Sequence, residues 1–443
     1  MLHYQVRCPG CGAMTDDNGV MNSCSSGCSG KTVPVFQPRG PVAIDRNATG
    51  FRRYAALLPC SEVLDTPFPV STFRATRLAE TLGFDNLYLT LTGHFPKLGQ
   101  TSPTCSFKEL EAVAVFSRLR THDCRRPVLL ASAGNTARAF AYFGAKIGYP
   151  TVIAVPGNAR ASLWLPDEDG LAERVERFVR FVSVREPGNY LDASRLCAAV
   201  QAALGSAVIN EGGFTNIGRT TGLGLCAASF VDAVGRVPDH YVQAVGSASG
   251  AVAALRTYEL LMGASARPMS LHLIQNAPYT LLVDALEARR VKVDATPYLD
   301  YIDSACSPML TSADPAYAYP GGLKERLDDG WSIGGAAVTN SEIYSAQHLA
   351  WRTERLQLLL PAAAALAGLK QLVESGRIGR TETVQLNLTG GGEEQLKAEC
   401  GYFHPHLDEG LSAIIPEVRG EVARGDAAHR VAGRLGRWIA EFE

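Results

Sequence analysis

The stretch 127-PVLLASAGNTARAFAYFGAKIGYPTVIAVP-156 alternates between two hydrophobic patterns. Residues 127–133 and 151–156 are short apolar runs of the kind that form buried strands, and 135–148 between them has the length and composition of a helix. A strand, a helix and a second strand in this order favour a βαβ unit with parallel strands. This segment therefore predicts an α/β fold.

The same alternation extends to both sides of this stretch. A helix is expected at 51–59 and a strand at 86–93, whereas 294–340 is expected to form loops or a mobile segment. Further strands are expected at 178–184, 206–210, 240–245, 270–275 and 383–389. Further helices are expected at 189–203, 217–234, 251–263, 279–288 and 361–374. Strands that alternate with helices of this length predict a doubly wound parallel sheet.

The composition excludes several classes of protein. The chain has 443 residues, of which 46% are hydrophobic and 19% charged, as expected for a soluble enzyme of two or three domains. A net charge of −2 gives no electrostatic reason to expect binding to nucleic acid or to an anionic membrane. The longest apolar run, 358–369, is too short to span a bilayer, and the N-terminus does not resemble a signal peptide. A cytoplasmic location is therefore expected.

A lysine lies in the first turn of an otherwise apolar helix. In 101-TSPTCSFKELEAVAVFSRLR-120, the residues from Phe107 onward predict a buried helix, and Lys108 is its second residue. Burial disfavours the charged form of an ammonium group, so a lysine at this position needs a chemical reason. Cys105 is the scattered cysteine that remains a functional candidate. The others are expected to be ordinary thiols: Cys60, Cys124, Cys197, Cys226, Cys306 and Cys400.

Loops at the carboxyl ends of parallel strands are the usual ligand-binding places in open sheets. The loop in 131-ASAGNTARAF-140 leads into a helix whose first amides can bind a carboxylate, and Asn135 offers both a donor and an acceptor. An ordinary helix cap would equally explain Ser132 or Asn135 taken alone.

Two further loops have features of a cofactor site. The loop in 243-QAVGSASGAVAAL-255 has small residues between a strand and a helix, where a phosphate can bind. It lacks both the GxGxxG pattern and the lysine of a nucleotide loop, which favours a cofactor monophosphate. Thr389 ends a strand and precedes Gly390–Gly392. For both loops, a glycine-containing turn that binds nothing is the alternative.

Together these groups suit pyridoxal 5′-phosphate (PLP). Lys108 would form a Schiff base with its aldehyde. Asn135 would contact the ring hydroxyl and Thr389 the pyridine nitrogen, where a neutral partner favours elimination and replacement over transamination. The phosphate would be bound by the loop Gly246, Ser247, Ala248, Ser249 and Gly250.

The order of these motifs resembles the fold-type II PLP enzymes, a family that includes tryptophan synthase β. Within it, the chain is most similar to the threonine synthase group and its cysteate synthases. The strings that carry the resemblance are 106-SFKELEA-112, 132-SAGNTARAF-140, 210-NEGGFTN-216, 239-DHYVQAVGS-247, 275-QNAPY-279 and 389-TGGG-392. Cys105 departs from the family pattern, in which a glycine is expected. The GSASG loop and 93–104 also depart from it, which leaves the substrate more open than the cofactor.

The resemblance implies β-replacement on an amino acid such as O-phospho-L-serine, through an aminoacrylate, with sulfite or another small nucleophile. Lys108 would hold PLP and move the α-proton. The substrate carboxylate would bind to Ser132, Ala133, Gly134, Asn135 and Thr136. Candidates for contacts to the leaving group and the incoming anion, each otherwise a surface charge, are Lys97, Arg138 and Arg219. A homodimer is usual for such relatives.

Four cysteines near the N-terminus have the spacing of a metal site. In 8-CPGCGAMTDDNGVMNSCSSGC-28 they form two close pairs, and four thiolates on two turns suit a structural zinc. The predicted ligands are Cys8, Cys11, Cys24 and Cys28. Free cysteines on a surface arm are the alternative. Because only three basic residues lie within 1–40, a nucleic-acid-binding ribbon is not favoured.

The resemblance also implies a domain division. Residues 1–40 would form a zinc-ribbon-like segment, 41–125 with 221–443 a large PLP-binding domain, and 126–220 a small α/β domain. Besides β-replacement, two readings stay open. One is threonine-synthase-like γ-elimination and replacement, or a β-eliminating lyase. The other is a non-catalytic binding protein with this fold, which the retention of Lys108 disfavours.

Overall fold

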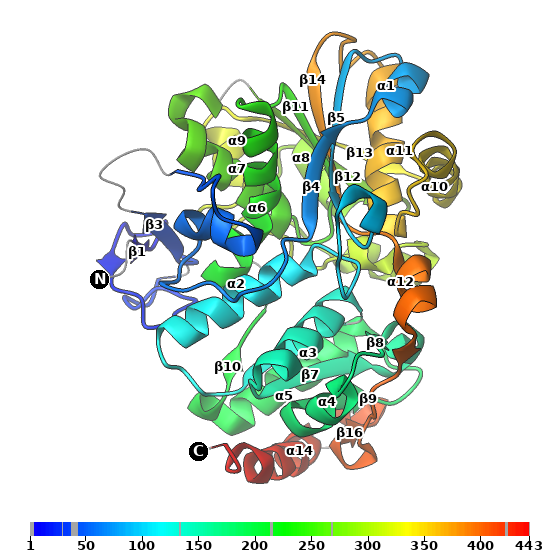
Figure 1. Cartoon of the computed structure of the whole chain (residues 1–443). Helices are drawn as coiled ribbons and strands as arrows, with labels where there is room; N and C mark the ends of the chain where they lie inside the picture. The colour runs from blue at the N-terminus through cyan, green and yellow to red at the C-terminus, as the bar shows by residue number, and fades with distance from the viewer. Residues whose placement is uncertain are drawn as a thin grey trace. The chain divides into compact units, whose positions relative to one another are not determined.

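The computed structural model describes residues 4–28, 30–36, 43–132, 134–212, 216–266, 269–420 and 424–442. The chain divides into two compact units (Figure 1). Unit 1 comprises Met1–Val115 and Gly213–Glu393, and unit 2 comprises Phe116–Gly212 and Glu394–Glu443. Each unit contains a sheet of mainly parallel strands with helices packed on it, so the predicted α/β class is confirmed. No described helix is both long enough and apolar enough to cross a membrane.

The sheet of unit 1 has six strands in the order β13-β12-β11-β14-β5-β4. Their bounds, in that order, are Ser332–Val338, Ser270–Asn276, His240–Ala244, Thr383–Leu388, Asn86–Thr92 and Val70–Arg74. All neighbouring strands pair in parallel except β4, which pairs antiparallel with β5 at one edge. An antiparallel edge strand on a parallel sheet is common in doubly wound folds.

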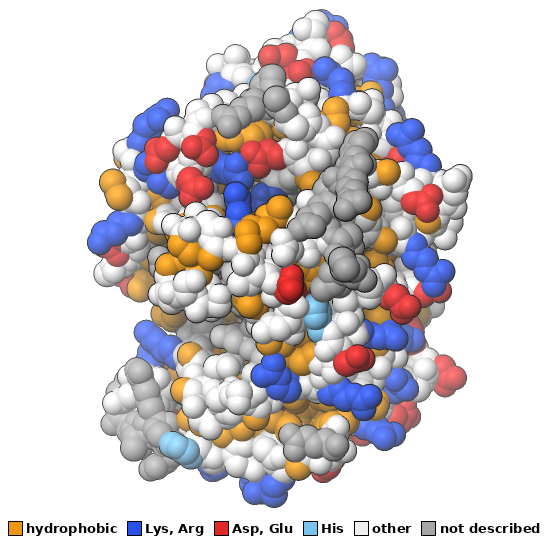
Figure 2. Space-filling view, turned by 90° about the vertical axis from the view of Figure 1, so that its left-hand side faces the viewer, with side chains coloured by type: hydrophobic (Ala, Val, Ile, Leu, Met, Phe, Trp, Pro, Cys, Tyr) orange, Lys and Arg blue, Asp and Glu red, His pale blue; other side chains and the backbone are white. Residues whose placement is uncertain are grey.

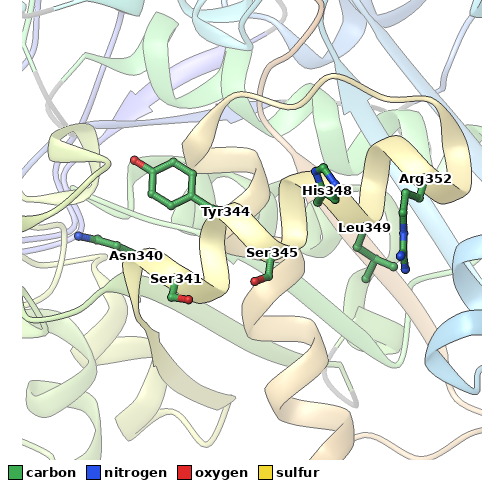
Figure 3. Close-up of a pocket in the computed structure, with 7 residues that line it drawn as sticks. All are labelled: Asn340, Ser341, Tyr344, Ser345, His348, Leu349 and Arg352. Atoms are coloured by element: carbon green, nitrogen blue, oxygen red, sulfur yellow. The ribbon is translucent and has the colours of Figure 1, made fainter.

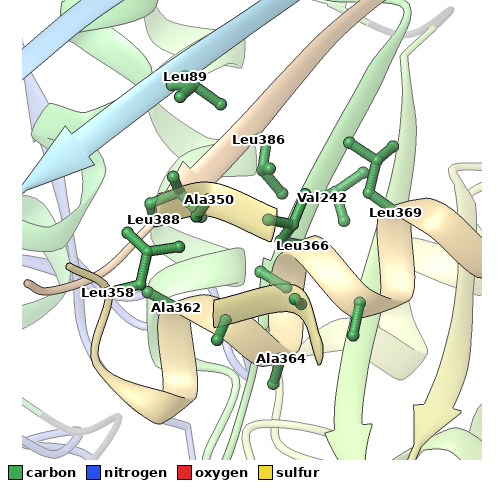
Figure 4. Close-up of a cluster of buried hydrophobic side chains, with 14 of the residues drawn as sticks. Leu89, Val242, Ala350, Leu358, Ala362, Ala364, Leu366, Leu369, Leu386 and Leu388 are labelled. Atoms are coloured by element: carbon green, nitrogen blue, oxygen red, sulfur yellow. The ribbon is translucent and has the colours of Figure 1, made fainter. Parts of the chain in front are cut away.

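Helices cover both faces of this sheet because alternate residues of each strand point to opposite sides. Val242 of β11 belongs to an apolar cluster with α11 (Leu360–Glu374), shown in Figure 4, whereas its neighbour Tyr241 belongs to a second cluster. The first cluster also includes residues of α1 (Thr76–Leu82) and α10 (Asn340–Glu354). The second includes residues of α6 (Ile217–Val234), α7 (Ser249–Met262), α8 (Leu281–Glu287) and α9 (Leu323–Asp328).

Unit 2 has a five-stranded parallel sheet in the order β10-β6-β7-β9-β16. The strands are, in that order, Ile209–Asn210, Val128–Ala131, Thr151–Pro156, Val179–Val184 and Ser412–Ala413. The helices are α3 (Asn135–Ile147), α4 (Leu171–Phe178), α5 (Tyr190–Leu204), α12 (Glu393–Cys400), α13 (Ile415–Arg419) and α14 (Arg424–Ile439). A short antiparallel pair joins β8 (Leu165–Pro166) to β15 (Tyr402–Phe403).

The C-terminal segment belongs to unit 2, whereas the sequence-based division placed all of 221–443 in the large domain. Two contacts explain the difference. Strand β16 pairs with β9 as an additional parallel strand, and α14 packs on α5. Val431, Leu435 and Trp438 of α14 are buried in the apolar cluster of unit 2. The pairing residues lie more than 200 positions apart, so no local pattern predicts this return of the chain.

The segment 294–340, expected to be loops, contains regular structure at its C-terminal end. It includes α9 and the edge strand β13, whose sequence 332-SIGGAAV-338 has two glycines and therefore a weak strand signal. Similarly, the expected helix at 51–59 is a 3-10 helix, Gly50–Leu57.

The N-terminal segment is a small antiparallel sheet in the order β2-β1-β3. Its strands are β1 (Tyr4–Arg7), β2 (Met14–Thr15) and β3 (Val33–Phe36). The buried Tyr4 hydroxyl donates to Asp17 Oδ2 at 2.7 Å and so links β1 to the segment after β2.

On the face of the molecule in Figure 2, Lys and Arg side chains are interspersed with Asp and Glu and form no single basic patch.

Candidate active site

Lys108 begins helix α2 (Lys108–Thr121), directly beside the end of strand β14 in unit 1. The Phe107 amide donates to the Thr389 carbonyl at 3.0 Å, and the Gly391 amide donates to the Cys105 carbonyl at 3.1 Å. The segment before the lysine therefore runs along the loop after β14. Cys105 is fully buried and has φ +59°, a left-handed conformation that glycine adopts without strain. This backbone requirement explains why a glycine is the residue expected there.

The side chain of Lys108 is only half-buried, whereas the sequence predicted a buried lysine. Its Nζ lies 2.5 Å from Glu111 Oε1 and 4.8 Å from the centre of the Phe107 ring. Glu111 is fully buried, and its Oε2 lies 3.4 Å from Arg219 Nε. One buried carboxylate thus lies between the two cations. Glu111 was not among the predicted site residues, although its position three residues after Lys108, one helical turn away, is a usable signal.

The loop 246–250 forms the start of α7 beside the same segment. Ala248 has φ +59°, which turns the chain into the helix, and Ser247 Oγ and Ser249 Oγ lie 3.0 Å apart. A Cβ added to Gly250 would lie 3.3 Å from the Phe107 ring, so the loop lies against the residue that precedes Lys108. The first amides of a helix, together with hydroxyl groups, form a site for a phosphate.

Thr389 and its glycines are held closely by neighbouring backbone. Thr389 is 6% exposed and follows the last residue of β14. A Cβ on Gly390 would lie 2.7 Å from the Cys105 carbonyl oxygen, and one on Gly392 would overlap the His94 carbonyl. The three glycines are therefore required by packing, which accounts for the motif independently of any ligand.

In unit 2, the loop after β6 begins helix α3. Ser132 Oγ accepts from the Gly134 amide at 3.2 Å and from the Ala137 amide at 3.0 Å, so this hydroxyl caps the helix. Asn135 is half-buried at the first helical position. Thr136 follows it and is also half-buried, whereas Ala133 lies outside the described residues.

The three candidate anion ligands are in different environments. Arg138 Nη2 donates to Asn135 Oδ1 at 2.7 Å, and its guanidinium group stacks over the buried Trp164 ring at 4.4 Å. Arg219 pairs with Glu111. Both arginines are buried, so neither is a surface charge. Lys97 is exposed in a 3-10 turn, Pro96–Leu98.

The four N-terminal cysteines come together as the spacing predicts. Their sulfur atoms all lie within 4.8 Å of one another, with Cys8 and Cys28 3.1 Å apart and Cys11 and Cys24 3.5 Å apart. A tetrahedral zinc with Zn–S bonds of about 2.3 Å needs sulfur separations of roughly 3.8 Å, so this cluster could hold the ion. The Ser26 amide lowers the pKa of the Cys24 thiol to about 6, which favours the thiolate that a metal binds.

A surface pocket of about 700 Å³ lies elsewhere in unit 1, along α10 (Figure 3). Its lining includes Tyr344, His348 and Arg352, and none of the predicted site residues. The residues that fit a cofactor are instead those around Phe107. An amine, two adjacent hydroxyls at a helix start and a strand-end threonine suit an aldehyde ring that carries a phosphate. This part of the chain therefore fits PLP.

Known proteins are similar to this chain over most of its length. It is 34% identical to a cysteate synthase of Methanocella paludicola, covering 89% of this chain and 91% of the relative. It is 33% identical to a cysteate synthase of Methanoculleus marisnigri, covering 99% and 98% respectively. A third cysteate synthase, of Methanosarcina barkeri, is 35% identical and covers 80% of this chain and 84% of the relative.

Solved structures show the same fold at lower identity. A threonine deaminase isoform from Solanum lycopersicum aligns with a TM-score of 0.55 at 16% identity, covering 81% of this chain and 90% of that chain. A serine racemase from Dictyostelium discoideum aligns with a TM-score of 0.53, also at 16% identity, covering 73% and 92%. The family model described as "Pyridoxal-phosphate dependent enzyme" matches residues 64–390, which include Lys108, the 246–250 loop and Thr389. The chain belongs to this family of pyridoxal-phosphate dependent enzymes.

Proposed function

We propose that the protein replaces the β-substituent of an O-phospho-L-serine-like amino acid with sulfite or a similar small nucleophile. The observation that carries this proposal is the similarity to cysteate synthases over nearly the whole chain. In the balanced reaction, the Cβ–O bond of the substrate breaks and phosphate leaves. A Cβ–S bond forms with sulfite, and the proton taken from Cα returns to it.

PLP, when bound, would supply the electron sink that makes the α-proton acidic. The Lys108 amine is the proposed covalent anchor and the base that takes this proton and gives it back. Glu111 lies where it can bind the Lys108 ammonium whenever the lysine is not joined to the cofactor. Arg219 adds a second cation, so the carboxylate keeps a partner when the lysine moves.

Other residues would bind and orient. The 246–250 loop is proposed to hold the cofactor phosphate, and Thr389 the pyridine nitrogen. In the 132–136 loop, Ser132 Oγ already accepts from two amides, so the Asn135 and Thr136 amides are the proposed donors to the substrate carboxylate. The side-chain oxygen of Asn135 already accepts a hydrogen bond from Arg138, so the side-chain NH₂ group of Asn135 is left to donate to another partner.

A substrate screen tests the proposal. Purified protein with PLP and sulfite should release phosphate from O-phosphoserine and form cysteate, detected by mass spectrometry. O-acetylserine and O-phosphohomoserine serve as comparison substrates that differ in leaving group or chain length. Turnover of O-phosphohomoserine without turnover of O-phosphoserine would replace this proposal with γ-chemistry. Pyruvate formation that does not depend on sulfite would replace it with β-elimination.

A further inference from the structure

The four-cysteine segment contacts a loop of unit 1 that lies far from it in sequence, residues 315–322. A Cβ on Gly10 would lie 3.5 Å from Pro320 Cγ and 3.4 Å from Cys28 Sγ. A Cβ on Gly321 would lie 3.3 Å from Pro9 Cγ. Pro9 and Gly10 lie between the predicted ligands Cys8 and Cys11, so the part of the segment that faces this loop is the predicted metal-binding turn.

The same loop contacts the proposed phosphate site in two ways. The Ala316 amide donates to the Ser247 carbonyl at 2.7 Å, which fixes the middle of the 246–250 loop from outside. Arg256 of α7, the helix that begins in this loop, donates from Nη2 to the Gly321 carbonyl at 3.0 Å. A continuous chain of contacts therefore joins the cysteine turn, the 315–322 loop and the phosphate site, all within unit 1.

We propose that the metal-bound cysteine segment positions the cofactor-phosphate loop through residues 315–322. This inference rests on the proposed assignment of 246–250 as the phosphate site. Residues 4–36 have too few apolar side chains to form a core of their own, so a bound metal would keep the segment folded. Loss of the metal would release the Pro9 and Gly10 contacts, after which the 315–322 loop could no longer hold Ser247 in place.

The test compares PLP with pyridoxal, which lacks only the phosphate. The dissociation constant of pyridoxal divided by that of PLP, both measured by absorbance on PLP-free protein, reports how strongly the phosphate is held. Removing zinc with a chelator should reduce this ratio about tenfold or more, as expected when charge-assisted hydrogen bonds to the phosphate are lost. Gly321→Ala should reduce it in the zinc-loaded protein, because the new methyl group would press on Pro9 and Arg256.

Gly330→Ala is the matched control. Gly330 has φ +88° and Gly321 has φ +80°, so both substitutions strain a left-handed backbone, but a Cβ at Gly330 would meet nothing within 4 Å. The ratio in Gly330→Ala should equal that of the unmodified protein. An unchanged ratio after zinc removal and in Gly321→Ala would overturn the link. If Gly321→Ala does not fold, zinc removal alone decides. Equal affinity for PLP and pyridoxal in the zinc-loaded protein would instead reject the phosphate assignment itself.

Discussion

The Nζ atom of Lys108 lies 2.5 Å from Oε1 of Glu111, a fully buried carboxylate that Arg219 approaches from its other side at 3.4 Å. A helix with so many apolar residues can hold this lysine because the charge of the lysine is compensated within one turn of the helix. The amine stays half-buried at the end of the sheet.

Replacing Glu111 should destabilise the cofactor-free protein. Glu111→Gln would leave two cations facing a neutral group, and removing one partner of a buried pair costs about 3–5 kcal/mol. Because Lys108 keeps some exposure, we expect a loss of about 2–3 kcal/mol in the free energy of unfolding, measured by urea titration. Glu80→Gln on the exposed side of α1 is the control and should change it by less than about 0.5 kcal/mol. Equal stability of both variants would contradict the role of Glu111.

Lys108→Ala should abolish covalent attachment of the cofactor. Borohydride reduction of the unmodified protein with PLP should fix the cofactor to one peptide, identified by mass spectrometry as the peptide that contains Lys108. Lys97→Ala is the control, because Lys97 is exposed in a short turn and should leave the trapping unchanged. A Lys108→Ala protein that still traps PLP on a single lysine would refute the assignment.

Patterns that are local in sequence predicted much of the fold. The βαβ unit over 127–156 appears as β6, α3 and β7, because apolar runs and helical spacing are encoded within each segment. The glycine turn after Thr389 was predicted for the same reason. Strand β13 was not predicted, because two glycines weaken its signal and pairing with β12 alone makes it a strand. The placement of α14 depends on contacts with distant residues, which no local pattern contains.

The candidate site was predictable as a set of loops but not as a set of contacts. The 246–250 loop follows from the rule that ligands bind beyond strand ends. Lys108 follows from a different signal, a lysine in the first turn of an apolar helix. The pairing of Arg219 with Glu111 joins residues that are far apart in the chain, and the sequence suggested an anion ligand instead. Arg138 was likewise expected to be a possible surface charge, whereas it is 2% exposed and donates to Asn135.

Metal analysis should find about one zinc ion per chain. Cys28→Ser should lower the zinc content and the thermal midpoint, since a structural zinc site contributes its binding free energy to folding. Cys60→Ser is the control, because this buried thiol lies outside the cluster and burial raises the pKa of Cys60 to about 12. Full modification of Cys8 and Cys24 by a thiol reagent in freshly purified, folded protein would contradict a closed metal site.

A buried histidine pair should make stability fall in acid. His272 Nε2 lies 2.9 Å from His240 Nδ1, and burial, with the nearby His240 and Arg377, lowers the pKa of His272 to about 3. Unfolded histidine has a pKa of about 6.5, so between these values the unfolded chain binds a proton that the folded protein refuses. The contribution of His272 to the free energy of unfolding therefore does not change with pH above pH 6.5. Below that pH the free energy of unfolding falls progressively, by about 2 kcal/mol at pH 5. His272→Gln should flatten the dependence of unfolding free energy on pH in this window, and an unchanged slope would exclude His272 as its source.

Gly392 should not tolerate a side chain, whereas Gly376, whose backbone is similarly strained, should tolerate one. Gly392 has φ +79° and a Cβ there would overlap the His94 carbonyl, while Gly376 has φ +70° and nothing within 4 Å. Gly376→Ala should cost about 1–2 kcal/mol, the penalty of a left-handed backbone alone. Gly392→Ala adds a backbone clash, so we expect a total loss above about 3 kcal/mol in urea unfolding. Because this glycine directly follows the Thr389–Gly391 segment that contacts Cys105 and Phe107, PLP affinity should fall in the same variant and not in Gly376→Ala. Similar losses of stability in the two variants would mean that the loop after β14 can move away from His94, and that Thr389 is not held rigidly beside Lys108.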